Sequence, residues 1–291
     1  MSFLKNYCKV AGALLLWSTW GVLVKRLQLA PHHIVFLTTL FSLPTILVLA
    51  GRNPRTLRDN LSGARRNYPY LVLLALSLLI NNYFYFAAFN QTSIAIAVFS
   101  HYTAPLFVAL MAPFLIAERF EKRLLLPLFM ALSGLALILA QDWLTNFSAA
   151  DLKGSFYGVA SGLAYAFTLI FAKRLTAYLT PLSLAFWQGF FIVVLLFPFY
   201  ILSPPLFLPQ SAWFLLAGIG VTHCALAPML YLSGLKHIKA QHVAVIGYIE
   251  PLSAVLLGLL LMHEAPVWST WLGGSAILFS GFIITSQKKT I

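Results

Sequence analysis

The chain consists of long apolar runs separated by short polar connections, and each run has the length of a membrane-spanning helix. A helix needs about 20 apolar residues to cross the hydrocarbon of a bilayer. Because the runs are continuous and do not alternate between apolar and polar positions, they predict an all-α integral membrane protein and not a barrel of strands. Ten helices are expected, at roughly 8–24, 31–50, 69–89, 93–116, 124–140, 154–172, 181–201, 212–232, 242–262 and 266–285.

Composition supports a membrane protein. Hydrophobic residues make up 60% of the 291 residues and charged residues only 9%, too few for the surface of a soluble domain of this size. The net charge of +12 does not indicate nucleic acid as a partner, because the basic residues lie between apolar runs and not on one face. Cys8 and Cys224 are far apart and suggest neither a disulfide framework nor a metal site. No small-residue cleavage site follows the first run, which we interpret as an uncleaved helix.

The distribution of lysine and arginine predicts an orientation. With ten spans both termini lie on the same side of the membrane. If that side is the cytoplasm, 16 basic residues are cytoplasmic and 3 are external, namely Lys25, Arg26 and Lys153. Such a bias is the positive-inside pattern. We therefore expect a multi-pass protein of the cell inner (plasma) membrane with both termini cytoplasmic.

The two halves of the sequence repeat one another. A set of residues in the first half recurs 146 positions later: Tyr102, Pro105, Leu106, Leu110 and Glu118 correspond to Tyr248, Pro251, Leu252, Leu256 and Glu264. We place the repeats at 1–145 and 146–291. Five spans per repeat is an odd number, so the second repeat is expected to be inverted, with Glu118 cytoplasmic and Glu264 external. Inverted repeats are typical of secondary transporters, although a duplication kept only for packing is the alternative.

Motifs in both halves carry a resemblance to a known family. They are LWSTWG at 16–21, GLKHI at 234–238, IEP at 249–251 and LMHE at 261–264, with AFNQT at 88–92, AP at 104–105 and IAE at 116–118 in the first half. In their order and spacing they resemble the EamA-type members of the drug/metabolite transporter superfamily, over essentially the whole chain. The resemblance implies a ten-helix exporter or exchanger of small metabolites such as amino acids, with a central cavity lined by both repeats. The first half has Ala104 where the second has Glu250, so any role of that acid is asymmetric.

Glu250 is the main candidate for chemistry, because it is the only acidic residue well inside an expected span. An ionisable group at that depth is costly unless it is hydrated, paired or protonated, which makes a function the first hypothesis. It could exchange a proton during transport or bind a substrate ammonium group. The alternative is a structural hydrogen bond between helices.

Pro105 and Pro251 fall near the middles of the fourth and ninth expected helices. Each removes a backbone donor, so both helices are expected to bend there, as hinges or as static kinks.

Other polar and aromatic residues at similar depth complete the expected substrate or coupling site: Trp17, Asn82, His101, Tyr102, Gln188, His223 and Tyr248. For His101 and His223 a neutral histidine bonded between helices competes with proton relay or substrate contact. Asn81 and Asn82 point about 100° apart on a helix, so only one is expected to reach a cavity. For the aromatics, ordinary packing or lipid contact competes with a role in a pocket. Glu118 and Glu264 lie at helix ends, where capping or pairing is expected.

No phosphate-binding loop, dinucleotide fingerprint or HExxH motif is found, so we expect no cofactor and no metal. The expected function is secondary-active transport of small organic metabolites by alternating access, with the lipid bilayer as surroundings and protons as a candidate coupling ion. We do not expect an enzyme. The alternatives are an integral membrane enzyme acting on a lipid-derived substrate, with Glu250, His101 and His223 as acid and base groups, or a channel.

Overall fold

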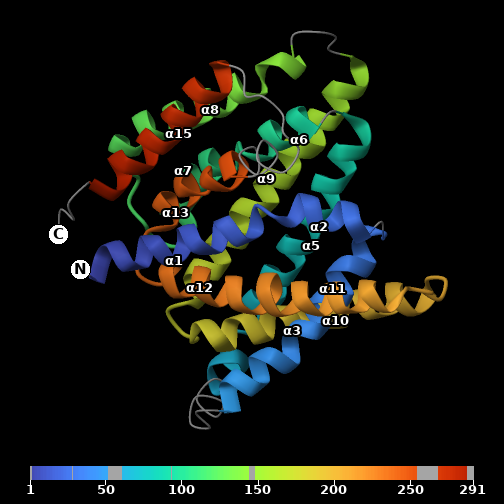
Figure 1. The fold of residues 1–291 in the computed structure, drawn as a ribbon. Coiled ribbons are helices and arrows are strands. Elements are labelled where there is room, and N and C mark those ends of the chain that lie inside the picture. Colours follow the sequence, from blue (N-terminus) through green and yellow to red (C-terminus); the bar gives the residue numbers. More distant parts are fainter. Residues whose placement is uncertain are drawn as a thin grey trace.

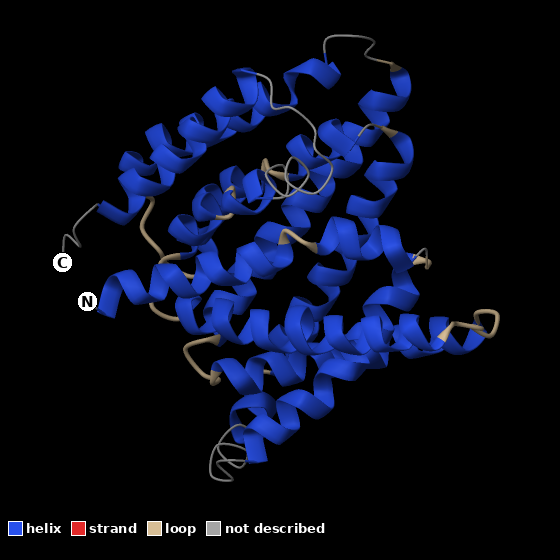
Figure 2. Ribbon diagram, in the orientation of Figure 1, coloured by secondary structure: helices blue, strands red, loops and turns tan. Residues whose placement is uncertain are grey.

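The computed structural model describes residues 2–27, 29–51, 61–92, 94–143, 148–253 and 268–286. All regular elements in this part of the chain are helices, and no strand occurs in it (Figure 2). The all-α fold predicted from the continuous apolar runs is confirmed. Glu264, Arg52, Arg55 and Arg58 lie outside the described residues, as does the end of the ninth expected helix.

Helical residues occur in each of the ten segments expected from the sequence, although several segments consist of two or three pieces. The elements are α1 (Ser2–Trp17), α2 (Trp20–Leu27), α3 (Pro31–Gly51), α5 (Tyr68–Gln91), α6 (Ile94–His101), α7 (Ala104–Leu115), η1 (Lys122–Leu124), α8 (Leu125–Trp143), α9 (Ala149–Leu175), α10 (Pro181–Leu202), α11 (Gln210–Ile219), η2 (Gly220–Leu226), α12 (Ala227–Leu235), α13 (Ala240–Ile246) and α15 (Trp268–Ser286). Residues 61–66 and 249–253 are also helical.

Six described segments are long and apolar enough to cross a membrane: Pro31–Gly51, Tyr68–Ala88, Ile96–Leu115, Ala149–Leu175, Pro181–Leu202 and Gln210–Leu235. The first expected span is divided at residues 18–19, and the ninth is interrupted at 247–248, so each provides only shorter helical pieces. The chain is therefore a multi-pass membrane protein, while the count of ten spans stays a prediction.

The main helix pairs each join an element before residue 145 to one after it. α5 packs on α9, α8 on α15, α1 on α12, and α3 on α10. Figure 1 shows α8 beside α15 and α1 beside α12, with the start of α1 and the end of α15 at the left of the molecule. The two halves of the chain are thus interleaved and share one interior.

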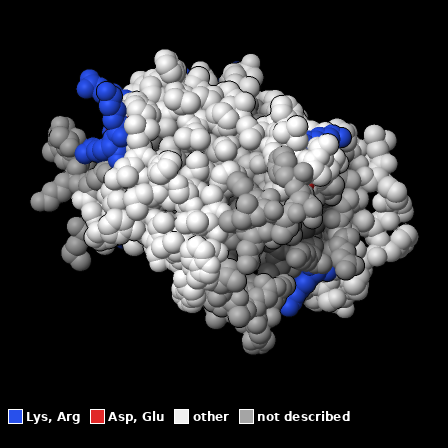
Figure 3. Space-filling model, turned by 90° about the horizontal axis from the view of Figure 1, so that it is seen from above, with Lys and Arg blue, Asp and Glu red and all other residues white. Residues whose placement is uncertain are grey.

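The outer surface is suited to lipid. Large apolar side chains are exposed on several helices, among them Phe114 at 88% and Leu202 at 85%. Lysine and arginine side chains on the face in Figure 3 lie toward its left and right, and the described (white) surface between them is mostly uncharged. Apolar exposure on this scale would be unfavourable in water and is favourable in a bilayer.

Candidate functional site

The fourth and ninth expected helices are both interrupted just before their prolines. α6 ends at His101 and α7 begins at Ala104, so the break precedes Pro105. In the second half α13 ends at Ile246, and the helix resumes at 249 before Pro251. Proline has no N–H to donate to the carbonyl four residues earlier, which explains a break at both places. The helices are thus interrupted where bends were expected, and the use of these points as hinges is a proposal.

The two breaks contact each other through Tyr102 and Tyr248, the two tyrosines that match at the 146-residue offset between the halves of the sequence. The Tyr248 hydroxyl donates to the backbone carbonyl of Tyr102 at 2.7 Å, and the two ring centroids are 5.5 Å apart. Tyr248 is completely buried. The interrupted helices therefore meet in the interior of the protein.

Glu250 lies at this junction and is surrounded by tyrosines. Its side chain is half-buried and shares a hydrogen bond with the side chain of Tyr102. Tyr85 on α5, Tyr165 on α9 and Tyr231 on α12 interact electrostatically with the carboxyl group. We call these five residues, Glu250 with Tyr85, Tyr102, Tyr165 and Tyr231, the Glu250 cluster. It draws one side chain from each of five helical segments.

Trp17 contacts the Glu250 cluster directly. Its ring lies 5.1 Å from that of Tyr231, and its indole Nε1 donates to the His223 carbonyl at 3.0 Å. His223 lies in η2, a π-helical turn, where its ring nitrogens contact the hydroxyls of Thr19 at 2.8 Å and Thr222 at 2.7 Å. The division of the first span at residues 18–19 is thus held against a π turn, a feature often found at functional sites.

His101 is at the edge of the cluster and is held there by ring contacts and a hydrogen bond. Its ring is 4.4 Å from Tyr85 and 5.5 Å from Tyr165, and its Nδ1 is 2.8 Å from the Ser161 hydroxyl. Because Ser161 donates its proton to the Gly158 carbonyl at 2.8 Å, the histidine Nδ1 is the donor to Ser161. This contact places a proton on Nδ1 of the His101 ring.

Asn82 and Gln188 are both half-buried. Within the described part of the chain, no hydrogen bond or ring contact joins either of them to the Glu250 cluster. Asn81, and not Asn82, is the buried amide, and it donates to the Ser161 carbonyl at 2.9 Å. Gln188 lies on α10, which packs mainly on α3 and α5. The geometry therefore gathers Trp17, His101, Tyr102, Tyr248 and Glu250 in one region.

The close packing of α9 on the interrupted fourth helix depends on glycines that were not among the residues expected at the site. Gly154, Gly158 and Gly162 are spaced four apart on α9. A Cβ at Gly158 would lie 2.4 Å from the Ser100 Cβ, and one at Gly162 would lie 2.5 Å from the His101 carbonyl oxygen. Small residues at this spacing let membrane helices approach closely. These glycines bring α9 against the end of α6 and against the His101 carbonyl, to which Pro105 cannot donate a hydrogen bond.

A second polar group, which we call the end cluster, joins the α7–α8 connection to the start of α13. Glu118 accepts from the backbone N–H of Ala240 at 2.9 Å and so caps α13. Glu121 is bonded to Lys239, to His242 Nε2 at 3.2 Å and to Arg123 at 3.0 Å. Tyr7 on α1 completes it, with its hydroxyl 2.8 Å from His242 Nδ1.

The two acids of the end cluster have opposite pKa shifts. Burial raises the pKa of Glu118, only partly opposed by Lys173 and the hydrogen bond from Ala240. For Glu121, burial acts in the same sense, but hydrogen bonds from Lys239, His242 and Arg123 prevail and lower its pKa to about 2. Apart from Glu118, these residues were not singled out from the sequence, since partners more than a hundred positions apart cannot be identified by spacing.

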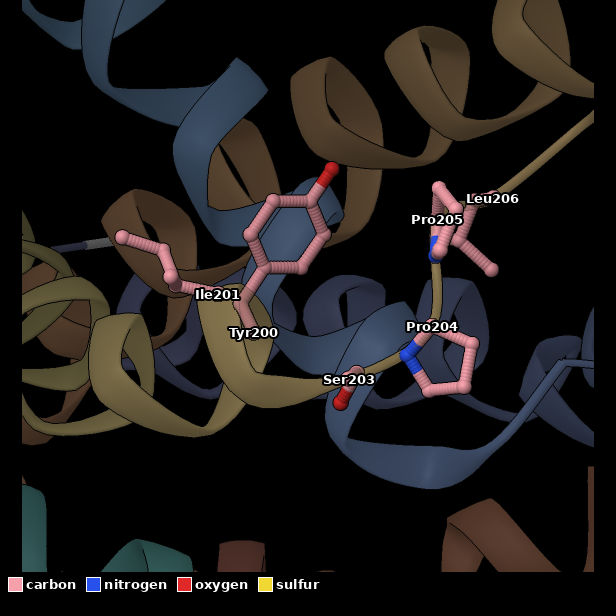
Figure 4. Close-up of a pocket in the computed structure, with 6 residues that line it drawn as sticks. All are labelled: Tyr200, Ile201, Ser203, Pro204, Pro205 and Leu206. Carbon is pink, nitrogen blue, oxygen red and sulfur yellow. The ribbon is translucent and has the colours of Figure 1, made fainter.

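Two surface pockets are present away from the Glu250 cluster. One, of about 350 Å³, lies at the end of α10 between Tyr200 and Leu206 (Figure 4). The other, of about 320 Å³, lies between residues 61–71 and α10. Neither is lined by a residue of the Glu250 cluster.

Relatives of this chain among known proteins are described as transporters. The chain is 29% identical over 204 residues to an uncharacterized transporter of Archaeoglobus fulgidus, covering 70% of this chain and 71% of that protein. It is 25% identical over 298 residues to YicL, an uncharacterized inner membrane transporter of Salmonella typhimurium, covering 98% and 96%. A solved crystal structure has the same fold, with a TM-score of 0.78, 21% identity and coverage of 96% of this chain and 95% of that one.

The family model for EamA-like transporters matches this sequence twice, over residues 4–140 and over residues 152–286. Together the two matches include nearly all of the chain. The chain therefore belongs to the EamA-like transporter family, within the drug/metabolite transporter superfamily.

Proposed function

We propose that this transporter is secondary-active and moves small organic metabolites, such as amino acids, across the inner membrane by alternating access, with Glu250 at the centre of its substrate or coupling site. The observation that carries the proposal is a single carboxyl group held among tyrosines where two broken helices meet. Such a group can take up a proton or bind a substrate ammonium group, and the tyrosine rings offer faces on which a cation or an apolar side chain can rest.

The two halves of the chain, 1–145 and 146–291, are proposed to be inverted repeats. The helix pairing supports this. In the proposed repeat α1 corresponds to α9 and α5 corresponds to α12, so exchanging the two halves converts the pair α1–α12 into the pair α9–α5, which is also observed. The contact between Tyr102 and Tyr248 joins equivalent positions in the same way. Repeats related like this can exchange conformations and open a central site to either side in turn.

The end cluster and the prolines fit a gating cycle. Glu118 and Glu121 in the first half hold Ala240, Lys239 and His242 in the second half, so these contacts must separate before the site can open on that side. Pro105 and Pro251 leave weakly bonded backbone next to Tyr102 and Tyr248, where the helices can bend.

The test is uptake into proteoliposomes with a panel of amino acids and amines, with and without a pH gradient. We expect saturable transport of at least one solute, faster than in empty liposomes. Flux that never saturates would indicate a channel, and a product of changed mass would indicate an enzyme. A panel in which nothing moves faster than leak would refute the proposal.

Glu250→Gln then tests the role of the carboxyl group, because glutamine keeps its shape but cannot ionise. We expect a transport rate at least about tenfold lower or a loss of the response to the pH gradient. Asp151→Asn is the matched control. Asp151 is half-buried in the first turn of α9, about 21 Å along the helix from Tyr165, and asparagine keeps its size while removing its charge. Equal behaviour of Glu250→Gln and the wild type would remove Glu250 from the mechanism.

A further inference from the structure

The 320 Å³ pocket beside α10 has apolar walls with one cation at its edge. Leu71, Trp187 and Phe191 are among its lining residues, and Arg65 also lines it. The short helix at 61–66 holds Arg65 in place, because the neighbouring Ala64 is buried at 4% exposure and Asn67 donates to the Gly63 carbonyl at 2.9 Å. The guanidinium side chain is exposed, and none of the described carboxylates forms an ion pair with it.

The depth of these residues suggests which molecule the pocket fits. Arg65 lies three positions before Tyr68, the first residue of an apolar span, and so at the level of lipid headgroups. Tyr68 itself is 60% exposed, as is common for tyrosine at a membrane interface. Phe191 lies ten residues inside the span that begins at Pro181, about 15 Å along the helix. The pocket therefore runs from the headgroup level into the hydrocarbon.

We propose that this pocket binds an anionic phospholipid, with the headgroup phosphate on Arg65 and one acyl chain along the partly exposed Trp187 and Phe191. A guanidinium group binds phosphate through two parallel hydrogen bonds, which distinguishes an anionic lipid from a zwitterionic one whose own ammonium competes. Basic pockets between membrane helices are a recurring site for anionic lipids. The bound lipid joins α5 and α10, one element from each half. None of the residues that line the pocket belongs to the Glu250 cluster, so the two sites are separate.

The proposal is tested by native mass spectrometry of the purified full chain with phosphatidylglycerol or phosphatidylcholine added. We expect phosphatidylglycerol to be retained preferentially, and Arg65→Ala to lower its occupancy by about tenfold, the effect of losing one charge-assisted contact. The matched control is Arg66→Ala, which removes the next basic side chain, one that does not line the pocket. Equal loss in both variants would show a general attraction to a basic surface and overturn the proposal.

Fluorescence provides a second readout that does not depend on Arg65. Phosphatidylglycerol brominated on its acyl chain should quench Trp187, so the quenching should be smaller in Trp187→Phe than in the wild type. Phe191→Ala, which shortens the apolar wall of the pocket while keeping Arg65, should also lower retention of the lipid. If inorganic phosphate at millimolar concentration displaced the lipid completely, or if brominated phosphatidylcholine quenched equally, the site would not be one for anionic lipid.

Discussion

At the residue scale, Tyr102 is the side chain that links the helix break to the acid. Its hydroxyl is bonded to Glu250, and its backbone carbonyl accepts from Tyr248. Tyr102→Phe removes only the first of these bonds. A hydrogen bond to a charged group contributes about 1.5–3 kcal/mol, so we expect a change of about tenfold or more in transport and a shift of its pH profile.

Tyr248→Phe is the matched control for Tyr102→Phe, because it removes a bond to a neutral carbonyl and leaves Glu250 untouched. It should cost about 1 kcal/mol of stability without moving the pH profile of transport. Thermal unfolding in detergent and transport at several pH values measure both effects. Identical pH profiles for the two variants would contradict a specific role of the Tyr102 hydroxyl.

The sequence identified the residues of the Glu250 cluster unevenly. Glu250 and Tyr102 are predictable because an acid inside a span and a matching tyrosine pair are visible without a structure, as is the neighbouring mid-helix Trp17. Tyr85, Tyr165 and Tyr231 were not assigned to the site, since which face of a helix meets which neighbour depends on helix rotation. Glu121, in a connecting segment, gave no sign of partners 118 and 121 positions away.

At the element scale, hydropathy predicts where the helices lie. The irregularities inside the helices could be predicted only in part. Irregularities at Pro105 and Pro251 are predictable because proline removes a backbone donor, although Pro44 and Pro198 lie inside continuous helices. α9 begins at Ala149, five residues earlier than expected, because Ser148 and Asp151 form a capping box that overrides the polar composition of that turn. The π turn at Gly220–Leu226 has no comparable signal, since it depends on packing against α3 and α1.

The contact between α9 and the broken helix gives a prediction at this scale. Gly162→Ala would place a Cβ 2.5 Å from the His101 carbonyl oxygen, which is backbone and cannot move aside easily. Overpacking of this kind costs about 1–3 kcal/mol. We expect a lower unfolding temperature, measured by thermal unfolding of the purified protein in detergent.

Gly12→Ala is the control for Gly162→Ala. Gly12 is also inside a helix, and a Cβ there would have nothing within 4 Å. Both substitutions gain the same helix propensity of about 1 kcal/mol, so the difference between them isolates the packing. An unfolding temperature for Gly162→Ala at or above that of Gly12→Ala would mean that α9 does not approach α6 this closely.

At the scale of the whole molecule, the end cluster joins the two halves and should make stability depend on pH. The pKa of Glu121 is lowered from 4.5 to about 2. A carboxyl group with a lowered pKa stabilises the folded protein above its unfolded-state pKa and loses this contribution as the pH falls through the folded value. The loss through Glu121 is therefore expected between about pH 4.5 and 2.

Comparison of Glu121→Gln with the wild type measures this contribution. The difference in unfolding temperature should be large at neutral pH and should shrink as the pH falls from about 5 to 2. Glu118 has its pKa raised by burial, so its contribution changes with pH in the opposite sense and cannot produce the same curve. A difference that stayed constant with pH would show that Glu121 acts through its shape and not its charge.

The orientation in the membrane rests on the distribution of basic residues, and single cysteines can test it. With Cys8 and Cys224 replaced by serine, one cysteine is placed at Lys122, at Ala177 or at Phe207. All three are exposed, Lys122 at the start of the short helix η1 and the other two in connections between helices. Ala177 and Phe207 flank α10, so one span separates them, whereas α8 and α9 separate Lys122 from Ala177.

The positive-inside pattern places Lys122 and Ala177 in the cytoplasm. We expect a membrane-impermeant maleimide to label Phe207→Cys in intact cells, and the other two only after permeabilisation. Labelling of Ala177→Cys in intact cells would reverse the orientation, and opposite results for Lys122→Cys and Ala177→Cys would mean that α8 and α9 do not both cross. Only the expected pattern places the end cluster on the cytoplasmic side, where its opening would admit solutes from inside the cell.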